Sequence, residues 1–304
     1  MPKAYVFTRY GGPEAEALIE VDRPSPGPGQ VLVAVRAAGV NPVDWKQRTG
    51  YRRPGESGER DFPAYFGSEV SGVVAAVGAG VEGFAVGDPV FGRPVVGGYS
   101  EYALVPVDLI ATKPAALSFI DAATLPVAGV TAYEGIRQLD LPAGATVLVT
   151  GAGGGVGVAA VQIARALGLR VVGLASEAKK DFVESLGAVH VPSGPGWTER
   201  VPEAVDGVYD LVGGDVLEEA ATLLADRTKL VTAGAPPEVV EKLGGARVGR
   251  ARTPDRLAAV AELVVSGALD PHVTQTFPLE QAGEALRTVE EGHVRGKIVI
   301  EVAT

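Results

Sequence analysis

The sequence predicts an α/β protein with two domains, a small β-barrel-like domain and a doubly wound parallel sheet. Three observations predict this fold class. Short β-branched runs cut by glycine and proline fill residues 1 to about 115, which is typical of closely spaced β-strands. Beyond them, short apolar runs alternate with helical patterns, which indicates βαβ units around a parallel sheet. The length of 304 residues suits two domains of roughly 150 residues each.

Four short apolar runs predict strands in the first 115 residues. Val31–Val35 follows a turn rich in proline and glycine, and Val73–Val77 lies between two glycines. The same reasoning predicts strands at 89–91 and 99–105, because each follows a turn that contains glycine. Strands this short and this closely spaced favour a barrel-like β domain.

The pattern changes near residue 117, where helices and strands begin to alternate. Apolar spacing predicts a helix over 120–139, and the run Thr146–Thr150 predicts a buried strand. Residues 194–202 are expected to form an irregular loop, because they contain two glycines and two prolines. The doubly wound series continues with predicted helices at 155–167, 179–186 and 217–224 and predicted strands at 170–174, 188–191, 208–211 and 229–232.

The C-terminal part mixes helices and strands, and its last strand is free to return to the first domain. We therefore assign 1–118 with 268–304 to the first domain and 119–267 to the doubly wound domain. The elements expected in this part are helices at 254–266 and 279–290 and strands at 274–277 and 297–302.

Composition excludes several classes of function. The chain has 27 Lys plus Arg against 37 Asp plus Glu, a formal net charge of −10, so binding to a phosphate backbone is not expected. It has no cysteine, which removes disulfides, thiolate metal sites and a cysteine nucleophile. Neither a signal peptide nor a membrane-spanning segment is expected from the apolar runs. We expect a cytoplasmic protein with no nucleic-acid or membrane partner.

The segment Gly151–Gly157, which reads GAGGGVG, follows a predicted strand and begins a predicted helix. In that position small residues let backbone N–H groups approach a pyrophosphate, and the N-terminus of the helix favours its negative charge. The sequence therefore predicts a Rossmann dinucleotide-binding domain. The turn residues expected to contact the cofactor are Ala152, Gly153, Gly154, Gly155, Val156 and Gly157.

The end of the next strand indicates which cofactor is bound. NAD sites commonly place Asp or Glu there, where it accepts a hydrogen bond from the ribose 2′-hydroxyl. Here the strand is followed by Ser176, with Lys179 and Lys180 just beyond. A hydroxyl and two cations suit the 2′-phosphate of NADPH, which we expect in preference to NADH. NADH remains an alternative, because Glu177 is a possible ligand of the ribose hydroxyl. Both lysines also have a second interpretation, as solvated residues of a helix.

Several ordered motifs together resemble a known family. They include Gly39–Lys46, Phe62–Val74, Val86–Gly92, Ala122–Pro126, Thr131–Tyr133, the glycine turn with Gln162, Ser185–Ala188 and Gly296–Val299. The chain resembles the medium-chain dehydrogenase/reductase superfamily, and within it the zinc-free quinone oxidoreductase (zeta-crystallin-like) branch. The resemblance implies a GroES-like catalytic domain, a Rossmann domain, a cofactor in the cleft between them, and a homodimer or tetramer.

The resemblance also bears on zinc. Zinc-dependent relatives carry a cysteine ligand where this chain has Asn41 and a histidine ligand where it has Ser68. The three histidines of the chain, His190, His272 and His293, stand at neither position. We therefore expect no zinc, and alcohol dehydrogenation is disfavoured because nothing would polarise the alcohol.

The same resemblance supplies candidate site residues. Asn41 is expected to reach the nicotinamide or the substrate oxygen, although an asparagine before proline is also a common turn residue. Tyr51 is a candidate to hydrogen-bond or protonate a reduced carbonyl, and equally a surface tyrosine. Thr131 matches a position near the nicotinamide, and otherwise caps or packs a helix. The loop residues Ala233, Gly234 and Ala235 are expected to pass the nicotinamide.

These features predict an NADPH-dependent oxidoreductase that transfers hydride to a small quinone or α,β-unsaturated carbonyl without a metal. Two alternatives stay open: an enoyl-thioester reductase, and a protein that binds NADPH without turnover, since fold does not determine function. The substrate pocket depends on loops at 48–60 and 93–98, so the physiological substrate does not follow from the sequence.

Overall fold

The computed structural model describes residues 1–52, 60–251, 253–292 and 294–303. Part of the expected substrate loop, residues 53–59, therefore lies outside the described residues. The chain divides into two compact units, which are described separately. Apart from residues outside the described ranges, the first unit comprises Met1–Val127, Arg252–Val265 and Val273–Thr304. The second comprises Ala128–Ala251 and Ser266–His272.

The first unit contains a large, mainly antiparallel sheet with strand order β15-β16-β3-β5-β6-β8, in which β7 also pairs with β3. Its strands are β3 (Gln30–Val40), β5 (Val70–Val77), β6 (Pro89–Gly92), β7 (Tyr102–Pro106), β8 (Ile110–Thr112), β15 (Val273–Pro278) and β16 (Lys297–Glu301). A smaller antiparallel sheet has the order β2-β1-β4. It consists of β1 (Lys3–Phe7), β2 (Glu16–Glu20) and β4 (Ala64–Tyr65).

The last strand returns to the first unit, as expected from the sequence. β16 pairs antiparallel with β3, with Ile298 opposite Val40 and Ile300 opposite Ala38. The pairing is favourable because both strands are apolar and buried on both faces at this point. It also brings Lys297, the first residue of β16, to the end of β3, where α1 begins.

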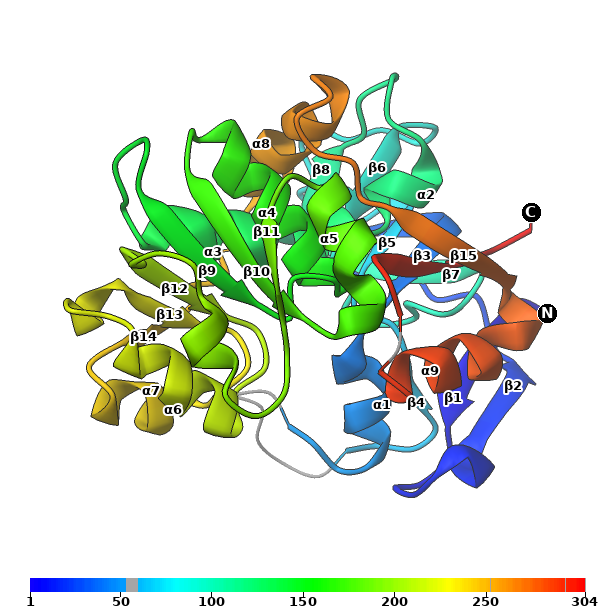
Figure 1. Cartoon of the computed structure of the whole chain (residues 1–304). Coiled ribbons are helices and arrows are strands. Elements are labelled where there is room, and N and C mark those ends of the chain that lie inside the picture. Colours follow the sequence, from blue (N-terminus) through cyan, green and yellow to red (C-terminus); the bar gives the residue numbers. More distant parts are fainter. Residues whose placement is uncertain (53–59, 252, 293, 304) are drawn as a thin grey trace. The chain divides into compact units, whose positions relative to one another are not determined.

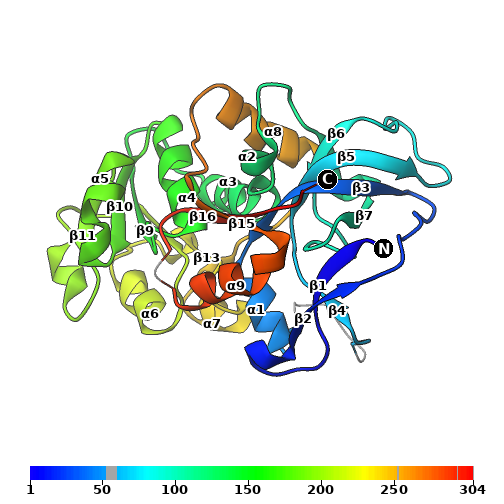
Figure 2. The same cartoon turned by 90° about the vertical axis from the view of Figure 1, so that its right-hand side faces the viewer.

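Within the described residues, the helices of the first unit are α1 (Pro42–Arg48), α2 (Phe119–Ala122), α8 (Pro254–Val265) and α9 (Ala282–Glu290). Helices α1 and α9 lie side by side (Figure 2). The buried core behind them contains packed aromatic rings; those of Phe7 and Phe66 are tilted by 45°, with their centroids 4.9 Å apart. This packing holds α1, and with it the residues that begin the helix, against the sheet.

The second unit is a parallel sheet of strand order β11-β10-β9-β12-β13-β14, which is the Rossmann order 3-2-1-4-5-6. Helices alternate with its strands along the chain (Figure 1). The strands are β9 (Thr146–Thr150), β10 (Arg170–Ala175), β11 (Val189–Pro192), β12 (Gly207–Asp210), β13 (Leu230–Thr232) and β14 (Ala246–Arg247). The helices are α3 (Val130–Gln138), α4 (Gly155–Ala166), α5 (Lys180–Ser185), α6 (Gly214–Thr222) and α7 (Pro237–Lys242). The predicted fold class, a Rossmann sheet with a separate GroES-like β domain, is confirmed.

Two local predictions were wrong. The single helix expected over 120–139 is divided into α2, a π-helical turn at Leu125–Gly129, and α3. Pro126 accounts for the break, because proline has no N–H for a helical hydrogen bond and its ring clashes with the preceding turn. The stretch 194–202 is more ordered than an irregular loop. Trp197 begins a 3₁₀ turn there and is buried in the core of the second unit.

Across the part of the chain that the structure describes, no helix is both long and apolar enough to cross a membrane.

Candidate functional site

The glycine-rich turn of the second unit joins the end of β9 to the start of α4. Gly151 has φ +66°, a conformation that glycine adopts without strain. Gly157 lies against the backbone of the turn, because a Cβ there would be 2.2 Å from the Gly151 carbonyl oxygen. Gly154, which caps α4, has φ −92° and space for a Cβ, whose nearest neighbour would be 3.5 Å away. Gly157 thus has no room for a side chain, whereas at Gly154 the turn has open space beside the backbone.

The same turn presents backbone donors to an anion. The N–H groups of Gly155, Val156 and Gly157 lie in the first turn of α4, where a helix has no carbonyl to accept from them. Ala152 donates its N–H to Leu174 on β10 at 3.1 Å, which ties the turn to the neighbouring strand. Together with the helix dipole, these groups form a site suited to a pyrophosphate.

The two candidate lysines after β10 differ in their surroundings. The aliphatic part of Lys179 lies across the turn, since a Cβ added to Gly153 would be 2.6 Å from Lys179 Cδ. Lys180 is exposed and pairs with Glu184, one helical turn further on, at 2.6 Å. That hydrogen bond is the main cause of the raised pKa of Lys180. Ser176 is exposed and precedes the short turn that contains Glu177. Of the two lysines, Lys179 is thus the one held against the glycine turn.

A buried polar cluster at the carboxyl ends of the strands was missed by sequence reasoning. Asp210, at the end of β12, accepts hydrogen bonds from the hydroxyls of Thr150 on β9 at 2.7 Å and Thr232 on β13 at 2.6 Å. It also accepts from the backbone N–H of Gly213 at 3.1 Å. The signal available in the sequence was a polar residue at the end of three apolar strands. The cluster holds the loops that line this edge of the sheet.

Part of that edge is formed by the predicted loop Ala233–Ala235. Its Gly234 and Ala235 N–H groups donate to the hydroxyl oxygen of Thr232 at 3.0 and 3.2 Å. Gly234 has no room for a side chain, because a Cβ would be 2.7 Å from the Val212 backbone. Thr131 lies in the first turn of α3, where it is buried, and its carbonyl accepts a hydrogen bond from Tyr209 at 2.6 Å.

In the first unit, Asn41 stands between β3 and α1 and is 4% exposed. Its Oδ1 accepts a hydrogen bond from Lys297 Nζ at 2.8 Å, and its Nδ2 donates to Glu69 Oε1 at 2.8 Å. Lys297 and Glu69 also form a buried ion pair at 2.9 Å. The other carboxylate oxygen of Glu69 accepts from the Val127 N–H at 2.7 Å. Asn41 therefore belongs to a network that joins four segments of the chain, at Asn41, Glu69, Val127 and Lys297.

A second carboxylate lies beside this network. Asp44 is fully buried and accepts hydrogen bonds from the Asn41 N–H at 2.9 Å and from the hydroxyls of Ser68 and Tyr99, both at 2.8 Å. Burial, and then the Asp44 carboxylate, raises the pKa of Tyr99 well above that of a free phenol. Tyr99 is therefore held in its neutral form as a donor.

Tyr51 is placed differently. It follows α1, is 38% exposed, and donates its backbone N–H to the Lys46 carbonyl at 2.9 Å. The buried network around Asn41 and the exposed Tyr51 ring therefore differ in their access to solvent.

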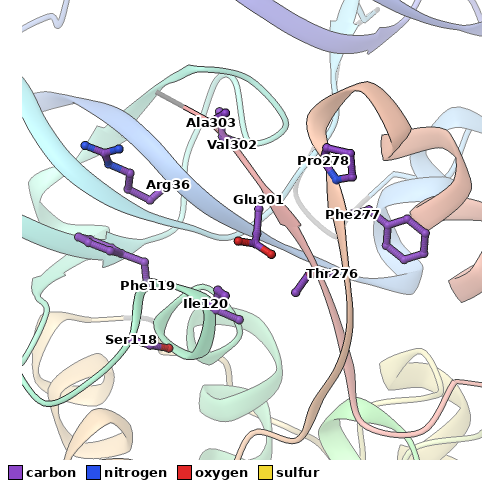
Figure 3. Close-up of a pocket in the computed structure, with 10 residues that line it drawn as sticks. All are labelled: Arg36, Ser118, Phe119, Ile120, Thr276, Phe277, Pro278, Glu301, Val302 and Ala303. Atoms are coloured by element: carbon purple, nitrogen blue, oxygen red, sulfur yellow. The ribbon is translucent and has the colours of Figure 1, made fainter.

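A cavity of about 620 Å³ in the first unit lies between the start of α2 and the ends of β15 and β16 (Figure 3). Phe119, Phe277 and Glu301 are among its lining residues, and none of the predicted site residues is. Because its lining includes none of the predicted site residues, we do not assign this cavity to the site.

The Rossmann order, the glycine turn on its first strand and the anion site at the start of α4 define a dinucleotide-binding protein. Comparison with known proteins agrees. Residues 27–115 match the alcohol dehydrogenase GroES-like domain, and residues 186–300 match the zinc-binding dehydrogenase family.

Similar proteins extend over the whole chain. A quinone oxidoreductase of Pseudomonas aeruginosa is 32% identical over 99% of both chains. An NADPH-dependent alkenal/one oxidoreductase of Arabidopsis thaliana is 32% identical, over 98% of this chain and 79% of the relative. An NAD-dependent alcohol dehydrogenase of Sulfolobus acidocaldarius is also 32% identical, over 99% of both chains. The solved structure of a quinone oxidoreductase from Coxiella burnetii has a TM-score of 0.91 and 30% identity over 99% of both chains.

The chain belongs to the medium-chain dehydrogenase/reductase superfamily, and its relatives fit the quinone oxidoreductase branch. Membership implies an enzyme that carries out oxidoreduction with an NAD(P) cofactor.

Proposed function

We propose that this protein is an NADPH-dependent reductase that delivers hydride to a quinone or an α,β-unsaturated carbonyl without zinc. The observation that carries the proposal is the network at Asn41, in which an ammonium and a carboxylate hold an amide at the end of β3. The quinone and alkenal reductases among the relatives supply the acceptor class.

The residues at this point do not suit a catalytic zinc ion. Zinc binds thiolate, imidazole or carboxylate ligands. The two positions at which zinc-dependent relatives carry ligands hold the amide of Asn41 and the hydroxyl of Ser68, and both make hydrogen bonds to buried carboxylates. The ammonium of Lys297 also contacts Asn41 Oδ1, so a second cation there would be repelled. Among the described residues no three His, Asp or Glu side chains cluster as a metal site would require.

The residues of the second unit suit NADPH. We propose that the N–H groups at the start of α4 hold the pyrophosphate, and that Lys179 and Ser176 contact the 2′-phosphate, with Lys180 further out. The position of Lys179 across Gly153 supports this assignment, because a cation beside the turn neutralises an added phosphate charge. Thr131 and the loop Ala233–Ala235 are proposed neighbours of the nicotinamide.

When bound, the cofactor supplies the hydride, and the protein orients it and stabilises charge on the acceptor. A quinone or enone accepts hydride at carbon, and negative charge then develops on its oxygen. We propose that Asn41 lies at the reacting end of the cofactor and orients the acceptor or the nicotinamide amide. Tyr51 is proposed to donate a hydrogen bond or proton to the reduced oxygen.

The test is to follow NADPH and NADH oxidation at the nicotinamide absorbance. Acceptors are 1,4-benzoquinone, a simple enone and an enoyl thioester, each with an enzyme-free control for direct reaction. We expect faster oxidation of NADPH than of NADH, with the quinone or enone preferred. A preference for the thioester would indicate an enoyl-thioester reductase. Tight NADPH binding without turnover would indicate a binding protein and contradict the proposal.

We also propose a homodimer, as the resemblance to the family implies. The short strand β14 ends the parallel sheet, and a sheet edge is a common site of association. Light scattering coupled to size-exclusion chromatography tests this, and a monomer of 31.1 kDa would contradict it.

A further inference from the structure

Lys297 is a buried cation whose hydrogen bonds are complete. It is 4% exposed, and its Nζ contacts the Val40 carbonyl oxygen at 2.9 Å, Asn41 Oδ1 at 2.8 Å and Glu69 Oε1 at 2.9 Å. A protonated amine has three hydrogens, and here three oxygens accept them. Lys297 therefore has no hydrogen left to donate to a substrate or to water. Its role must lie in its effect on the groups that accept these hydrogen bonds.

Lys297, together with Glu69, fixes the orientation of the Asn41 side-chain amide. An amide presents an acceptor on one side and a donor on the other, and asparagine often has two orientations of similar energy. An ammonium only donates and a carboxylate only accepts. Because Lys297 and Glu69 flank the amide, Oδ1 must face Lys297 and Nδ2 must face Glu69. The reversed amide would place donor against donor and acceptor against acceptor.

The glycine at position 39 leaves the space that the Glu69 carboxylate occupies. A Cβ at Gly39 would be 2.1 Å from Glu69 Oε1 and 2.5 Å from the Ala123 carbonyl oxygen. The Glu69 carboxylate therefore packs where any other residue at position 39 would place its side chain. With Gly39 on one side and the Val127 N–H on the other, the carboxylate cannot turn away from Asn41.

Stability alone is a poor explanation for this arrangement. The residues that follow Lys297 in β16, Ile298, Val299 and Ile300, are fully buried hydrophobics. Replacing a buried ion pair by packed hydrophobic residues is often neutral or stabilising. A charged pair at this place is therefore better explained by specificity, which here means one orientation of one amide.

We propose that Lys297 is a positioning residue, which holds the Asn41 amide in the single orientation that the reaction uses. This inference rests on the proposed function, because that function puts Asn41 at the reacting end of the cofactor. The Asn41 Nδ2 donates to Glu69 Oε1 at 2.8 Å and to the Gly39 carbonyl oxygen at 3.4 Å, and Oδ1 accepts from Lys297 with one of its two lone pairs. The second lone pair of Oδ1 is what Asn41 presents to a ligand.

The first test uses Lys297→Met, which keeps the unbranched apolar stem of the side chain and removes the ammonium group. Lys3→Met is the matched control, since Lys3 forms an exposed ion pair with Glu280. We expect kcat of Lys297→Met to fall on the order of a hundredfold, the loss typical of a misplaced reacting group. The dissociation constant for NADPH should change less than threefold, because the glycine turn that binds the pyrophosphate is in the other unit. Lys3→Met should match the wild type.

A second variant separates positioning from folding. Lys297→Met leaves Glu69 buried without its partner, so it is expected to lower the unfolding midpoint. Adding Glu69→Gln removes that unpaired charge. We expect the double variant to regain the unfolding midpoint but not kcat. A glutamine at position 69 can either donate to or accept from the Asn41 amide, so both amide orientations become possible. If kcat recovers together with the midpoint, the role of Lys297 is structural and the proposal is wrong.

A third readout does not depend on turnover. The side-chain amide signal of Asn41 in a ¹⁵N-resolved NMR spectrum is assigned by its loss in Asn41→Asp. We expect its protons to exchange with water at least tenfold faster in Lys297→Met than in the wild type. An unchanged amide signal would overturn the proposal. If the wild type shows no turnover but the amide responds, the proposed function fails while the role of Lys297 in orienting the amide stands.

Discussion

The side chain of Lys179 lies across Gly153, so closely that a Cβ on the glycine would be 2.6 Å from Lys179 Cδ. The two residues come from different turns, one after β9 and one after β10. Their contact places a cation beside the first strand of the Rossmann sheet, where a dinucleotide phosphate binds in this fold.

Lys179→Gln is expected to weaken NADPH binding and to leave NADH binding nearly unchanged. A hydrogen bond between charged groups contributes about 1.5–3 kcal/mol, which corresponds to a loss of roughly tenfold or more. Isothermal titration of both cofactors measures the effect. The matched control is Lys180→Gln, which loses an exposed pair with Glu184 and should change NADPH affinity much less. A larger effect at Lys180 would reverse the assignment.

Gly154→Val is expected to abolish tight cofactor binding and to leave the protein folded. The position accepts a Cβ, whose nearest neighbour would be the Gly151 carbonyl oxygen at 3.5 Å. The valine would nevertheless occupy the space in which a pyrophosphate approaches the backbone. We expect an affinity loss on the order of a hundredfold, from two or more charge-assisted hydrogen bonds. Circular dichroism and titration with NADPH check the two halves of this prediction.

Two further glycines make this experiment interpretable. Gly157→Val should prevent folding, because its Cβ would meet the Gly151 carbonyl oxygen at 2.2 Å. Gly27→Val, in the first unit, would meet only the flexible Gln30 side chain at 3.3 Å and should bind NADPH normally. Unchanged affinity in Gly154→Val would mean that the turn does not hold the cofactor.

The buried tyrosine Tyr99 predicts a loss of stability at high pH. Its pKa is raised, first by burial and then by Asp44, whereas a tyrosine in the unfolded chain ionises near pH 10. Below about pH 10 both states are neutral and the contribution of Tyr99 to stability is complete. Above it the unfolded state loses a proton that the folded state keeps, so the free energy of unfolding falls by about 1.4 kcal/mol per pH unit for this group.

Denaturant unfolding at about pH 9 and about pH 11 measures this slope. In Tyr99→Phe the free energy of unfolding should fall less steeply with pH, by about 1.4 kcal/mol per pH unit, because this phenol no longer ionises in the unfolded state. The variant should also lose about 1–3 kcal/mol at neutral pH, because Asp44 loses a donor. Tyr10→Phe, at an exposed position, is the control. An unchanged slope in Tyr99→Phe would show that this phenol does not set the alkaline limit.

Purified protein is expected to contain no stoichiometric zinc and to keep its reductase activity after treatment with a chelator. The reason is the ligand chemistry at Asn41 and Ser68, which offer an amide and a hydroxyl beside the ammonium of Lys297. Elemental analysis by mass spectrometry and an activity assay with and without chelator test it. One bound equivalent whose removal stops turnover would contradict the zinc-free proposal.

Several elements could be predicted because their signals are local. The strand Thr146–Thr150 is found as predicted, since a β-branched run bounded by glycine has few alternatives. The helix after the glycine turn begins at Gly155, as expected for a strand–turn–helix junction. The prediction of a single helix over 120–139 was wrong, because the spacing of apolar residues takes no account of the missing N–H of Pro126.

The order of the elements, the glycine turn and the absence of cysteine ligands can be read from the amino-acid sequence, because each depends on residues close together in the chain or on composition alone. The remaining relationships depend on contacts between distant residues. Lys297 lies 256 residues from Asn41, and only the pairing of β16 with β3 brings them together. Likewise, Lys179 and Lys180 are adjacent in sequence, but only packing places one across the turn and the other beside Glu184. Such contacts depend on strand register and helix rotation, which arise from burial of the whole core.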